Sequence, residues 1–253
     1  MHAAPHITHC DLIGDLHGCY YEWLALLDRL GYVRTNDGGY QHSAGHTLVL
    51  VGDLTDRGPM NVAVLKLAMR LYRSGTLLLV RGNHDDKLAR ALAGRKVITG
   101  SGLARTLREI TRAGEAFTTT LRRFLEELPL QLSLDHGRLL VVHAGIRPNY
   151  IGKSHDAARA FCLFGETTGR TDATGFPERL DWTRNHPGTP YVVYGHTPRN
   201  SVYFNNNTAG IDTGCVFGNT LTALRYPELT TVSVPAARVY SGVKPQLIRA
   251  GLK

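Results

Sequence analysis

Short apolar runs alternate with amphipathic stretches along the first part of the chain. Residues 12–13, 47–51 and 76–80 are leucine-rich or β-branched, and each run leads to a glycine and then to polar residues. Such runs are typical of buried strands that end in a loop. Residues 20–30 and 61–73 instead repeat apolar side chains at every third or fourth position, which predicts helices. This alternation predicts an α/β fold in which ligands bind where strands end.

The rest of the chain separates into a charged helical stretch and a part with more strand character. Residues 85–128 predict a helical cap or insertion, which we expect four glycines, at positions 94, 100, 102 and 114, to break into pieces. Strand-like runs return at residues 139–142, 191–194, 201–204 and 220–225. Residues 165–187 are rich in glycine, threonine and proline, which predicts a long functional connection.

Composition narrows the class of protein without choosing a substrate. A chain of 253 residues with 43% hydrophobic and 20% charged residues predicts one globular domain over residues 1–253. The net charge of +8 favours anionic partners such as phosphorylated proteins, nucleotides or nucleic acid. Because the arginines are scattered along the chain, a generally solvated basic surface is the alternative.

The four cysteines and the absence of a long apolar run bear on the compartment in which the protein is expected to reside. No two cysteines form a C-x-x-C pair, so we expect free thiols and no structural zinc. No apolar run approaches the roughly 20 residues that span a bilayer, and the first ten residues lack a signal-peptide pattern. We therefore expect a soluble, cytoplasmic protein without a membrane partner.

Polar residues of unusual type gather directly after the predicted strands. They occupy five segments: Gly14-Asp15-Leu16-His17-Gly18, Gly52-Asp53-Leu54-Thr55-Asp56-Arg57-Gly58, Gly82-Asn83-His84-Asp85, His143 and His196. Carboxylates, imidazoles and an amide are suitable ligands for Mn²⁺, Fe or Zn²⁺. One such segment alone would more often be a turn or a helix cap. Five of them in order indicate a metal site.

These motifs, spread over residues 11–215, resemble the signature of the phosphoprotein-phosphatase family of binuclear metallophosphoesterases. Residues 84–95, 161–169 and 211–218 most resemble the phosphatase domain of bacterial polynucleotide kinase-phosphatases. Stand-alone bacterial relatives include Ser/Thr phosphatases and diadenosine tetraphosphatases. The resemblance implies an α/β metallophosphoesterase sandwich of four layers, in which two mixed β-sheets are flanked by helices.

The resemblance also implies a pair of divalent metal ions, with Mn²⁺ preferred and Fe or Zn²⁺ as alternatives. The implied ligands of one metal are Asp15, His17 and Asp53. Those of the other metal are Asp53, Asn83, His143 and His196, so that Asp53 bridges the two. A hydroxide that bridges the metals would attack the phosphorus directly, because coordination lowers the pKa of water to about 7.

Four further residues receive roles from the same resemblance. His84 would protonate the leaving group, and Asp56 would orient it. Arg57 and Arg184 would bind phosphate oxygens, although an exposed loop arginine is the alternative for Arg184. Asp212 follows a predicted strand and is either a carboxylate that orients a ligand or a plain turn residue.

The predicted reaction is therefore metal-dependent hydrolysis of a phosphate ester, and the substrate stays open. Three classes remain: phosphoserine or phosphothreonine proteins, dinucleoside polyphosphates, and 2′,3′-phosphates of nucleotides or of nucleic-acid ends. The alternative from another class is a non-catalytic module that binds nucleic acid or phosphate on the same fold. The sequence leaves the oligomeric state and the metal bound in the cell open.

Overall fold

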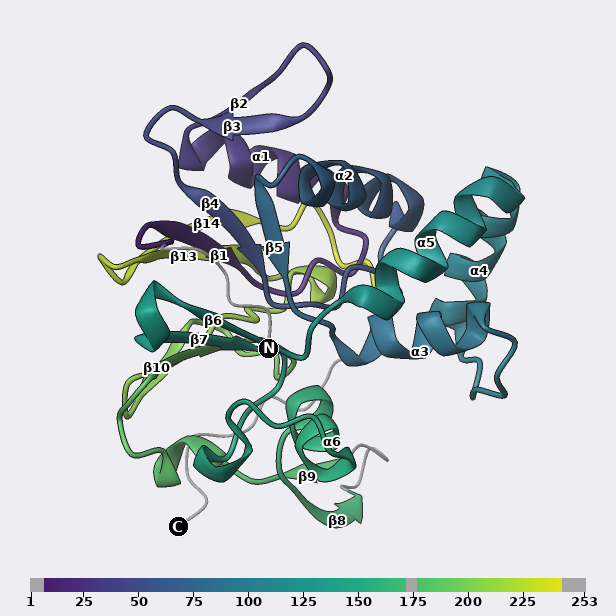
Figure 1. Cartoon of the computed structure of the whole chain (residues 1–253). Coiled ribbons are helices and arrows are strands. Elements are labelled where there is room, and N and C mark those ends of the chain that lie inside the picture. The colour runs from purple at the N-terminus through teal and green to yellow at the C-terminus, as the bar shows by residue number, and fades with distance from the viewer. Residues whose placement is uncertain (1–6, 172–176, 243–253) are drawn as a thin grey trace.

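Two mixed β-sheets form the centre of the computed structural model, which describes residues 7–171 and 177–242 (Figure 1). The first sheet has the order β14-β13-β1-β4-β5, with bounds Thr230–Pro235, Thr220–Tyr226, Cys10–Ile13, Thr47–Leu50 and Leu77–Leu79. The second has the order β11-β12-β10-β7-β6, with bounds Tyr203–Asn205, Thr208–Gly210, Tyr191–Tyr194, Leu139–Val142 and Gln131–Leu134. In each sheet, parallel neighbours lie beside an antiparallel edge.

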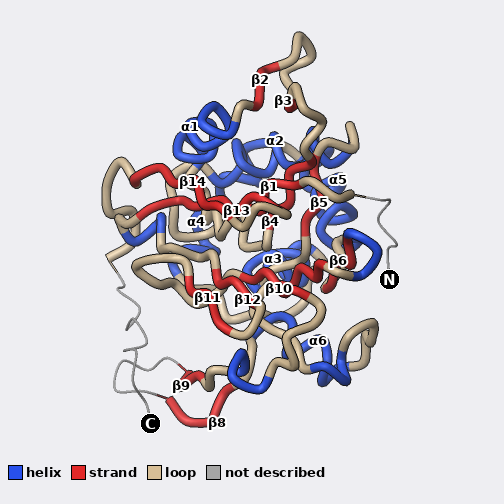
Figure 2. Tube along the Cα trace, turned by 90° about the vertical axis from the view of Figure 1, so that its left-hand side faces the viewer, coloured by secondary structure: helices blue, strands red, loops and turns tan. Residues whose placement is uncertain are grey.

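Helices cover the outer faces of both sheets (Figures 1 and 2). Helices α1 (Tyr20–Leu30) and α2 (Asn61–Arg73) cover the first sheet, and α6 (Asp156–Phe164) lies below the second. Helices α3 (Asn83–Leu92), α4 (Ser101–Ala113) and α5 (Glu115–Glu127) pack together at one side. This arrangement confirms the expected sandwich of two sheets flanked by helices.

Smaller elements connect these layers. They are the hairpin strands β2 (Tyr32–Arg34) and β3 (Tyr40–His42), the paired strands β8 (Thr167–Thr171) and β9 (Pro177–Arg179), and the 3-10 helices η1 (Asp135–Gly137), η2 (Pro148–Tyr150), η3 (Trp182–Asn185) and η4 (Cys215–Phe217). Strands β8 and β9 lie beside α6, below the second sheet (Figure 1).

The central strands are apolar on both faces because each sheet packs against the other sheet on one face and against helices on the opposite face. Leu12 and Val49 point into the space between the sheets, where they belong to the same core cluster as Val141. Ile13 and Leu50 face the opposite way, toward the helices that cover the first sheet. Strands buried on both faces read as continuous apolar runs. The sequence therefore predicted β1 and β4 correctly.

Several predicted elements agree with the structure and others do not. The helices predicted at residues 20–30 and 61–73 are α1 and α2. The prediction of a connection without secondary structure at residues 165–187 is wrong, since β8, β9 and η3 lie there. Strand β8 escaped notice because all of its residues are exposed, so that it carries no apolar alternation. Residues 172–176 of this stretch lie outside the described residues.

Glycine 102 was expected to interrupt a helix, yet it lies inside α4. A Cβ at Gly102 would approach the backbone nitrogen of Arg57 to 3.2 Å. The glycine therefore allows α4 to pack closely against a loop of the predicted site. The division of the chain into one domain with an insertion at about 85–128 stays a prediction.

Within residues 7–171 and 177–242, no helix is both long and apolar enough to cross a membrane. The prediction that the first ten residues are not a signal peptide falls partly on residues 1–6, which lie outside the described part of the chain. The four cysteines are free thiols with buried side chains, as expected.

Candidate active site

The predicted ligands follow the ends of strands whose carboxyl ends meet at one edge of the two sheets. β1, β4 and β5 run parallel in the first sheet, and β7 and β10 run parallel in the second. His17, Asp53 and His196, which follow β1, β4 and β10, have positive φ values of 42°, 52° and 69°. Residues other than glycine seldom adopt this conformation, and such positions gather at functional sites. The loops therefore hold these side chains in unusual directions.

The glycines beside these residues make room for carboxylates. A Cβ at Gly195 would lie 2.0 Å from Asp15 Oδ1, and a Cβ at Gly82 would lie 2.3 Å from Asp53 Oδ1. No larger side chain fits at either position. Steric exclusion by these carboxylates thus explains why glycine precedes both His196 and Asn83.

Asp53 lies between two groups of histidines. Its Oδ2 atom is 3.6 Å from His17 Nε2, and its Oδ1 atom is 3.5 Å from His143 Nε2. His17, Asp53 and His84 offer ligand atoms within 4.8 Å of one another, and so do Asp53, His143 and His196. Because Asp53 is only 2% exposed and contributes to both groups, it can serve two cations at once.

The ring nitrogens of the two central histidines are already oriented. His17 Nδ1 lies 2.8 Å from the carbonyl oxygen of Thr55, and His143 Nδ1 lies 2.8 Å from that of Val51. A ring that donates its Nδ1 proton to a carbonyl presents Nε2 as an acceptor, which is the usual arrangement of a metal-binding histidine. In His143 this acceptor lies 2.9 Å from Asn83 Oδ1.

Several acceptor atoms therefore converge at this edge, although Arg57 Nη1 lies 2.6 Å from His17 Nε2 and the backbone N–H of His84 donates to Asp53 Oδ1 at 2.9 Å. His196 Nδ1 lies 3.0 Å from His143 Nε2, while its own Nε2 is buried and has no hydrogen-bond partner among the described residues. Asp15 is buried and accepts the backbone N–H of His196 at 3.1 Å. The donor set thus suits divalent metal ions.

The electrostatics agree with that donor set. Burial lowers the pKa of His17, His143 and His196, so their imidazoles are neutral, the form that binds metal. Burial raises the pKa of Asp53, but the surrounding histidines outweigh it and hold that pKa below its usual range. Burial, then Asp212 and Asp53, raise the pKa of Asp15. A bound cation would oppose this shift, because a positive charge stabilises the ionised form of a buried carboxylate.

His84 and Asp56 form a hydrogen-bonded pair at the border of this site. His84 Nδ1 lies 2.6 Å from Asp56 Oδ2, and Thr106 of α4 donates to Asp56 Oδ1 at 2.6 Å. The His84 side chain is 15% exposed, so it can reach a ligand that enters from solvent. Asp56 is fixed from two sides and in turn fixes the ring of His84.

Arg57 points into the site from the same loop. Its Nη1 atom lies 2.6 Å from His17 Nε2, and its Cζ atom lies 5.5 Å from the centre of the Phe217 ring. Asp212 is 5% exposed, and its Oδ1 atom accepts the backbone N–H of Gly214 at 3.0 Å. Burial raises the pKa of Asp212 to about 6, and Arg57 opposes that shift. Asp212 therefore both caps its own turn and acts electrostatically on Arg57.

Of the two arginines near η3, the structure brings a different one to the site than the sequence suggested. Arg184 has a 60% exposed side chain and pairs with Asp181 at 3.5 Å. Arg179 is half-buried, and its charge acts on Asp53, on His143 and on His196. Sequence reasoning missed Arg179 because both arginines lie in one polar stretch, and nothing in the sequence says which faces the metal ligands.

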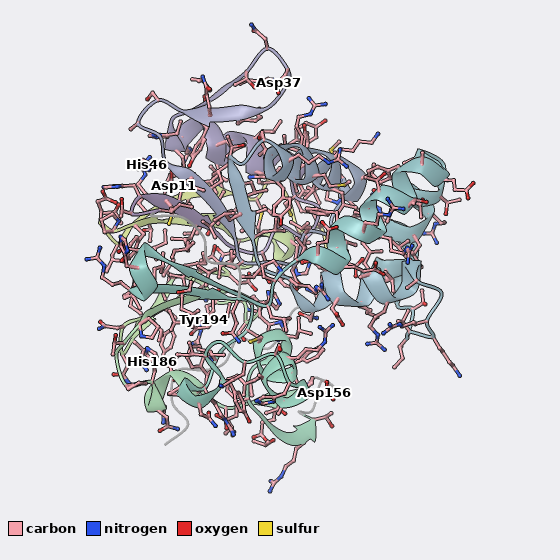
Figure 3. The ribbon with its side chains drawn as sticks, in the orientation of Figure 1. Asp11, Asp37, His46, Asp156, His186 and Tyr194 are labelled. Atoms are coloured by element: carbon pink, nitrogen blue, oxygen red, sulfur yellow. The ribbon has the colours of Figure 1, made fainter. Side chains whose placement is uncertain are left out.

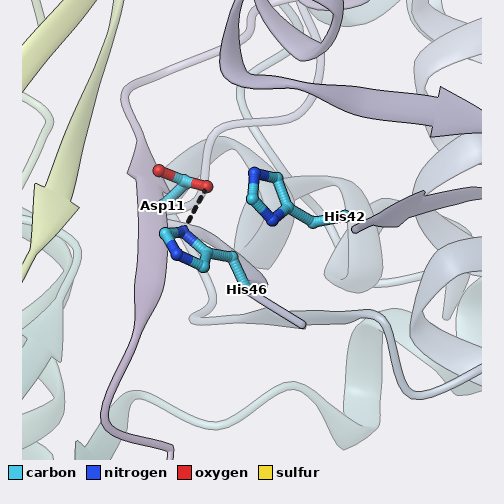
Figure 4. Close-up of side chains that lie close together, drawn as sticks. All are labelled: Asp11, His42 and His46. Atoms are coloured by element: carbon cyan, nitrogen blue, oxygen red, sulfur yellow. Dashed lines mark hydrogen bonds and ion pairs between the residues drawn. The ribbon is translucent and has the colours of Figure 1, made fainter. Parts of the chain in front are cut away.

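A second group of histidines and a carboxylate lies at the other end of the same strands (Figure 4). Asp11, His42 and His46 have ligand atoms within 4.8 Å of one another. Asp11 Oδ2 accepts the hydroxyl of Tyr32 at 2.9 Å and lies 3.3 Å from His46 Nδ1. Asp11 Oδ1 lies 3.3 Å from Arg225 Nε. Figure 3 shows Asp11 and His46 beside the first sheet. Because Asp11 has these partners, its negative charge is compensated without a metal.

The sequence is similar to a known protein family and to individual proteins. The sequence model of the calcineurin-like phosphoesterases matches residues 9–221. The asymmetrical bis(5'-nucleosyl)-tetraphosphatase PrpE of Anoxybacillus flavithermus is 45% identical over 238 residues, which cover 92% of this chain and 97% of that relative. The protein of the same name from Bacillus subtilis is 43% identical over 234 residues, which cover 91% and 96%.

Solved structures show the same fold. A crystal structure of a candidate diadenosine tetraphosphatase superposes with a TM-score of 0.69 at 24% identity and covers 92% of this chain and 96% of its own. A serine/threonine phosphatase from Saccharomyces cerevisiae superposes with a TM-score of 0.59 at 16% identity and covers 95% and 82%. Both likenesses concern the fold.

Proposed function

The chain belongs to the calcineurin-like phosphoesterase family and is a metal-dependent phosphoester hydrolase, and we propose that its substrates are dinucleoside tetraphosphates. The observation that carries the proposal is the buried Asp53, whose two oxygens each face a different histidine group. Relatives that are 41–45% identical over about nine tenths of the chain are named as bis(5'-nucleosyl)-tetraphosphatases. Those names supply the substrate class.

Two divalent metal ions would be held at this edge of the sheets. One would be bound by His17 and Asp53 together with Asp15, whose carboxylate interacts electrostatically with Asp53, and the other by Asp53, Asn83, His143 and His196. When bound, the ions would supply a nucleophile at neutral pH and would offset the charge of the phosphate group. Mn²⁺ stays our prediction for the metal, with Fe and Zn²⁺ as alternatives, since carboxylate, imidazole and amide donors suit all three.

The pair of His84 and Asp56 would act on the leaving group. His84 would donate its proton to the departing oxygen, while Asp56 holds Nδ1 and stabilises the charged ring. The partial exposure of His84 supports this role, because the departing group must lie toward solvent.

Two arginines would hold the phosphate that is attacked. Arg57 extends from the loop after β4 and can form two parallel hydrogen bonds to phosphate oxygens. We assign the second position to Arg179, because its charge acts on Asp53 and on the histidines. Arg184 is the alternative that the sequence suggested. Asp212 would limit the movement of Arg57 through its charge.

The location in the cell stays a prediction. Four buried free thiols support a reducing compartment such as the cytoplasm.

The test is hydrolysis by metal-stripped protein after Mn²⁺ is added back. The panel contains diadenosine tetraphosphate, a phosphoserine peptide and 2′-, 3′- and 2′,3′-cyclic nucleotides, and the products are separated by chromatography. We expect the highest kcat/KM for diadenosine tetraphosphate, with ATP and AMP as products. The Asp53→Asn variant serves as the control for contaminating phosphatases. A preference for the peptide or for the cyclic nucleotides would contradict the proposed substrate.

A further inference from the structure

A cavity opens directly beside the proposed metal ligands. It has a volume of about 340 Å³, and its wall includes Ala144 and Thr197, the residues that follow His143 and His196. Arg179 also lines it, as does Tyr194 of the second sheet, which Figure 3 labels. Part of this space is open to solvent, so a substrate can enter it from solution. A substrate whose scissile phosphate lies at the metals can therefore extend into this cavity.

Arg199 gives the cavity a positive charge: among the described residues no carboxylate lies within ion-pair distance of it, and Asp181 interacts with it only at longer range. The Arg199 Nε atom is buried, and it has no hydrogen-bond partner among the described residues. The two carboxylates in the wall have partners of their own. Glu166 is bonded to Arg147, and Asp181 accepts hydrogen bonds from Tyr203 and Thr183. A buried donor without a partner is costly unless a ligand completes it.

The guanidinium group of Arg199 is held in place before any ligand arrives. Its Cζ atom lies 3.9 Å from the centre of the Tyr203 ring. The backbone N–H of Arg199 donates to the carbonyl oxygen of Asp212 at 3.0 Å, and its own carbonyl accepts from Asn219 at 3.2 Å. An arginine fixed in this way loses little conformational entropy when it binds an anion.

Two exposed apolar side chains complete the cavity. Phe164 is 46% exposed and Leu180 is 47% exposed, and both line it. Arg179, which also lines the cavity, donates from Nη1 to the backbone carbonyl oxygen of Phe164 at 2.7 Å. An exposed aromatic ring offers a face on which a nucleobase can stack.

We propose that this cavity is the subsite for the part of the substrate beyond the scissile phosphate. Arg199 binds the further phosphates of a nucleoside polyphosphate, and Phe164 contacts the base. The inference rests on the proposed function, since it assigns the rest of a dinucleoside tetraphosphate to named residues. A small phosphomonoester would reach only Arg57 and Arg179. A polyphosphate would also reach Arg199 in the cavity, so the cavity favours polyphosphates over phosphomonoesters.

The Arg199→Ala variant tests the phosphate contact in two ways. The first is the ratio of kcat/KM for diadenosine tetraphosphate to that for p-nitrophenyl phosphate. We expect this ratio to fall by about 10- to 100-fold, the cost of a lost hydrogen bond to a charged group. The second is the inhibition constant of inorganic tripolyphosphate against p-nitrophenyl phosphate at constant free Mn²⁺, which should rise by about tenfold or more.

The matched control is Arg122→Ala, which removes an arginine that is 40% exposed and pairs with Glu126 on α5. Neither the ratio nor the inhibition constant should change in it. The Phe164→Ala variant should weaken inhibition by ATP more than inhibition by tripolyphosphate, because only ATP carries a base. If Arg199→Ala fails to fold, as judged by circular dichroism, Arg199→Gln replaces it with the same expectations.

The outcomes separate the subsite from the proposed function. An unchanged ratio together with an unchanged inhibition constant in a folded Arg199 variant would overturn the subsite. If the natural chain hydrolyses p-nitrophenyl phosphate but not diadenosine tetraphosphate, the proposed function fails. The tripolyphosphate measurement then still decides whether Arg199 binds a phosphate chain.

Discussion

Two groups of histidines and carboxylates lie at opposite ends of β1 and β4. Asp15 and Asp53 follow the carboxyl ends of these strands, whereas Asp11 lies in β1 and His46 directly precedes β4. Ligand atoms lie within 4.8 Å of one another in the Asp11 group and in each of the two groups that share Asp53. Residue type and proximity therefore do not distinguish them.

The partners of each atom do distinguish them. Both ring nitrogens of His42 are occupied, since Nε2 lies 3.1 Å from the Leu30 carbonyl oxygen and Nδ1 accepts the Ala44 N–H at 3.1 Å. At the other end, His196 Nε2 is buried without a partner among the described residues, and His17 and Asp53 have positive φ. Asp11 Oδ1 also accepts no hydrogen bond among the described residues, but it forms an ion pair with Arg225 at 3.3 Å. A buried nitrogen with no compensating partner, beside strained backbone, indicates function, whereas compensated charges indicate structure.

The largest effect should come from a matched pair of substitutions, Asp53→Asn and Asp11→Asn. Asp53→Asn removes the charge that both metals would share, so activity should fall below detection and bound metal should be lost. Metal content by inductively coupled plasma mass spectrometry and phosphate release measure this. Asp11→Asn should keep its activity and its metal. Two tightly bound metals in Asp53→Asn would contradict the bridging role.

The next largest effect should follow from His84→Ala. Turnover should fall by roughly 10² to 10⁴, and the loss should be greatest for poor leaving groups, which need the proton most. Metal content should stay unchanged. The measurement compares kcat for p-nitrophenyl phosphate with kcat for an alkyl phosphate. An equal loss for both substrates would remove the acid role from His84.

Asp11→Ala should affect stability and leave catalysis alone. It deprives the buried hydroxyl of Tyr32 and the guanidinium group of Arg225 of their shared carboxylate. We expect a loss of about 3 kcal/mol in the free energy of unfolding, measured by urea titration. Because Arg225 is 31% exposed, water can replace part of its ion pair, which limits the loss. A fall in kcat of the folded variant would show that the two groups are coupled.

The smallest effect should be the stabilisation by metal. A free metal concentration of about 100 times Kd should stabilise the natural chain by about 2.7 kcal/mol, seen as a rise in Tm over the chelator-treated protein. His42→Ala should keep the whole rise, whereas Asp53→Asn should lose it. A smaller rise in His42→Ala would indicate that the Asp11 group also binds metal.

The sequence was sufficient to predict that the proposed ligands lie together, because they follow buried strands. The apolar runs of β1, β4, β7 and β10 fix where each loop starts, and the polar residue after each strand is then determined. The same reasoning could not place Arg179, because strands β8 and β9 are exposed and their position depends on contacts remote in sequence. Nor could it separate the Asp11 group from a metal site, since the partners Tyr32 and Arg225 come from β2 and β13.

Helix α4 supplies no predicted ligand, yet it carries Gly102, which packs against Arg57, and Thr106, which holds Asp56. Both lie on one face of the helix, a single turn apart. A site transplanted into another scaffold would therefore need the predicted metal ligands and also the residues of α4 that support Arg57 and Asp56. A shortened protein without α4 would retain every predicted ligand but would lose the hydrogen bond from Thr106 to Asp56, the residue that would orient the proposed acid His84. We therefore expect this helix, more than the sheets, to limit how far the chain can be shortened.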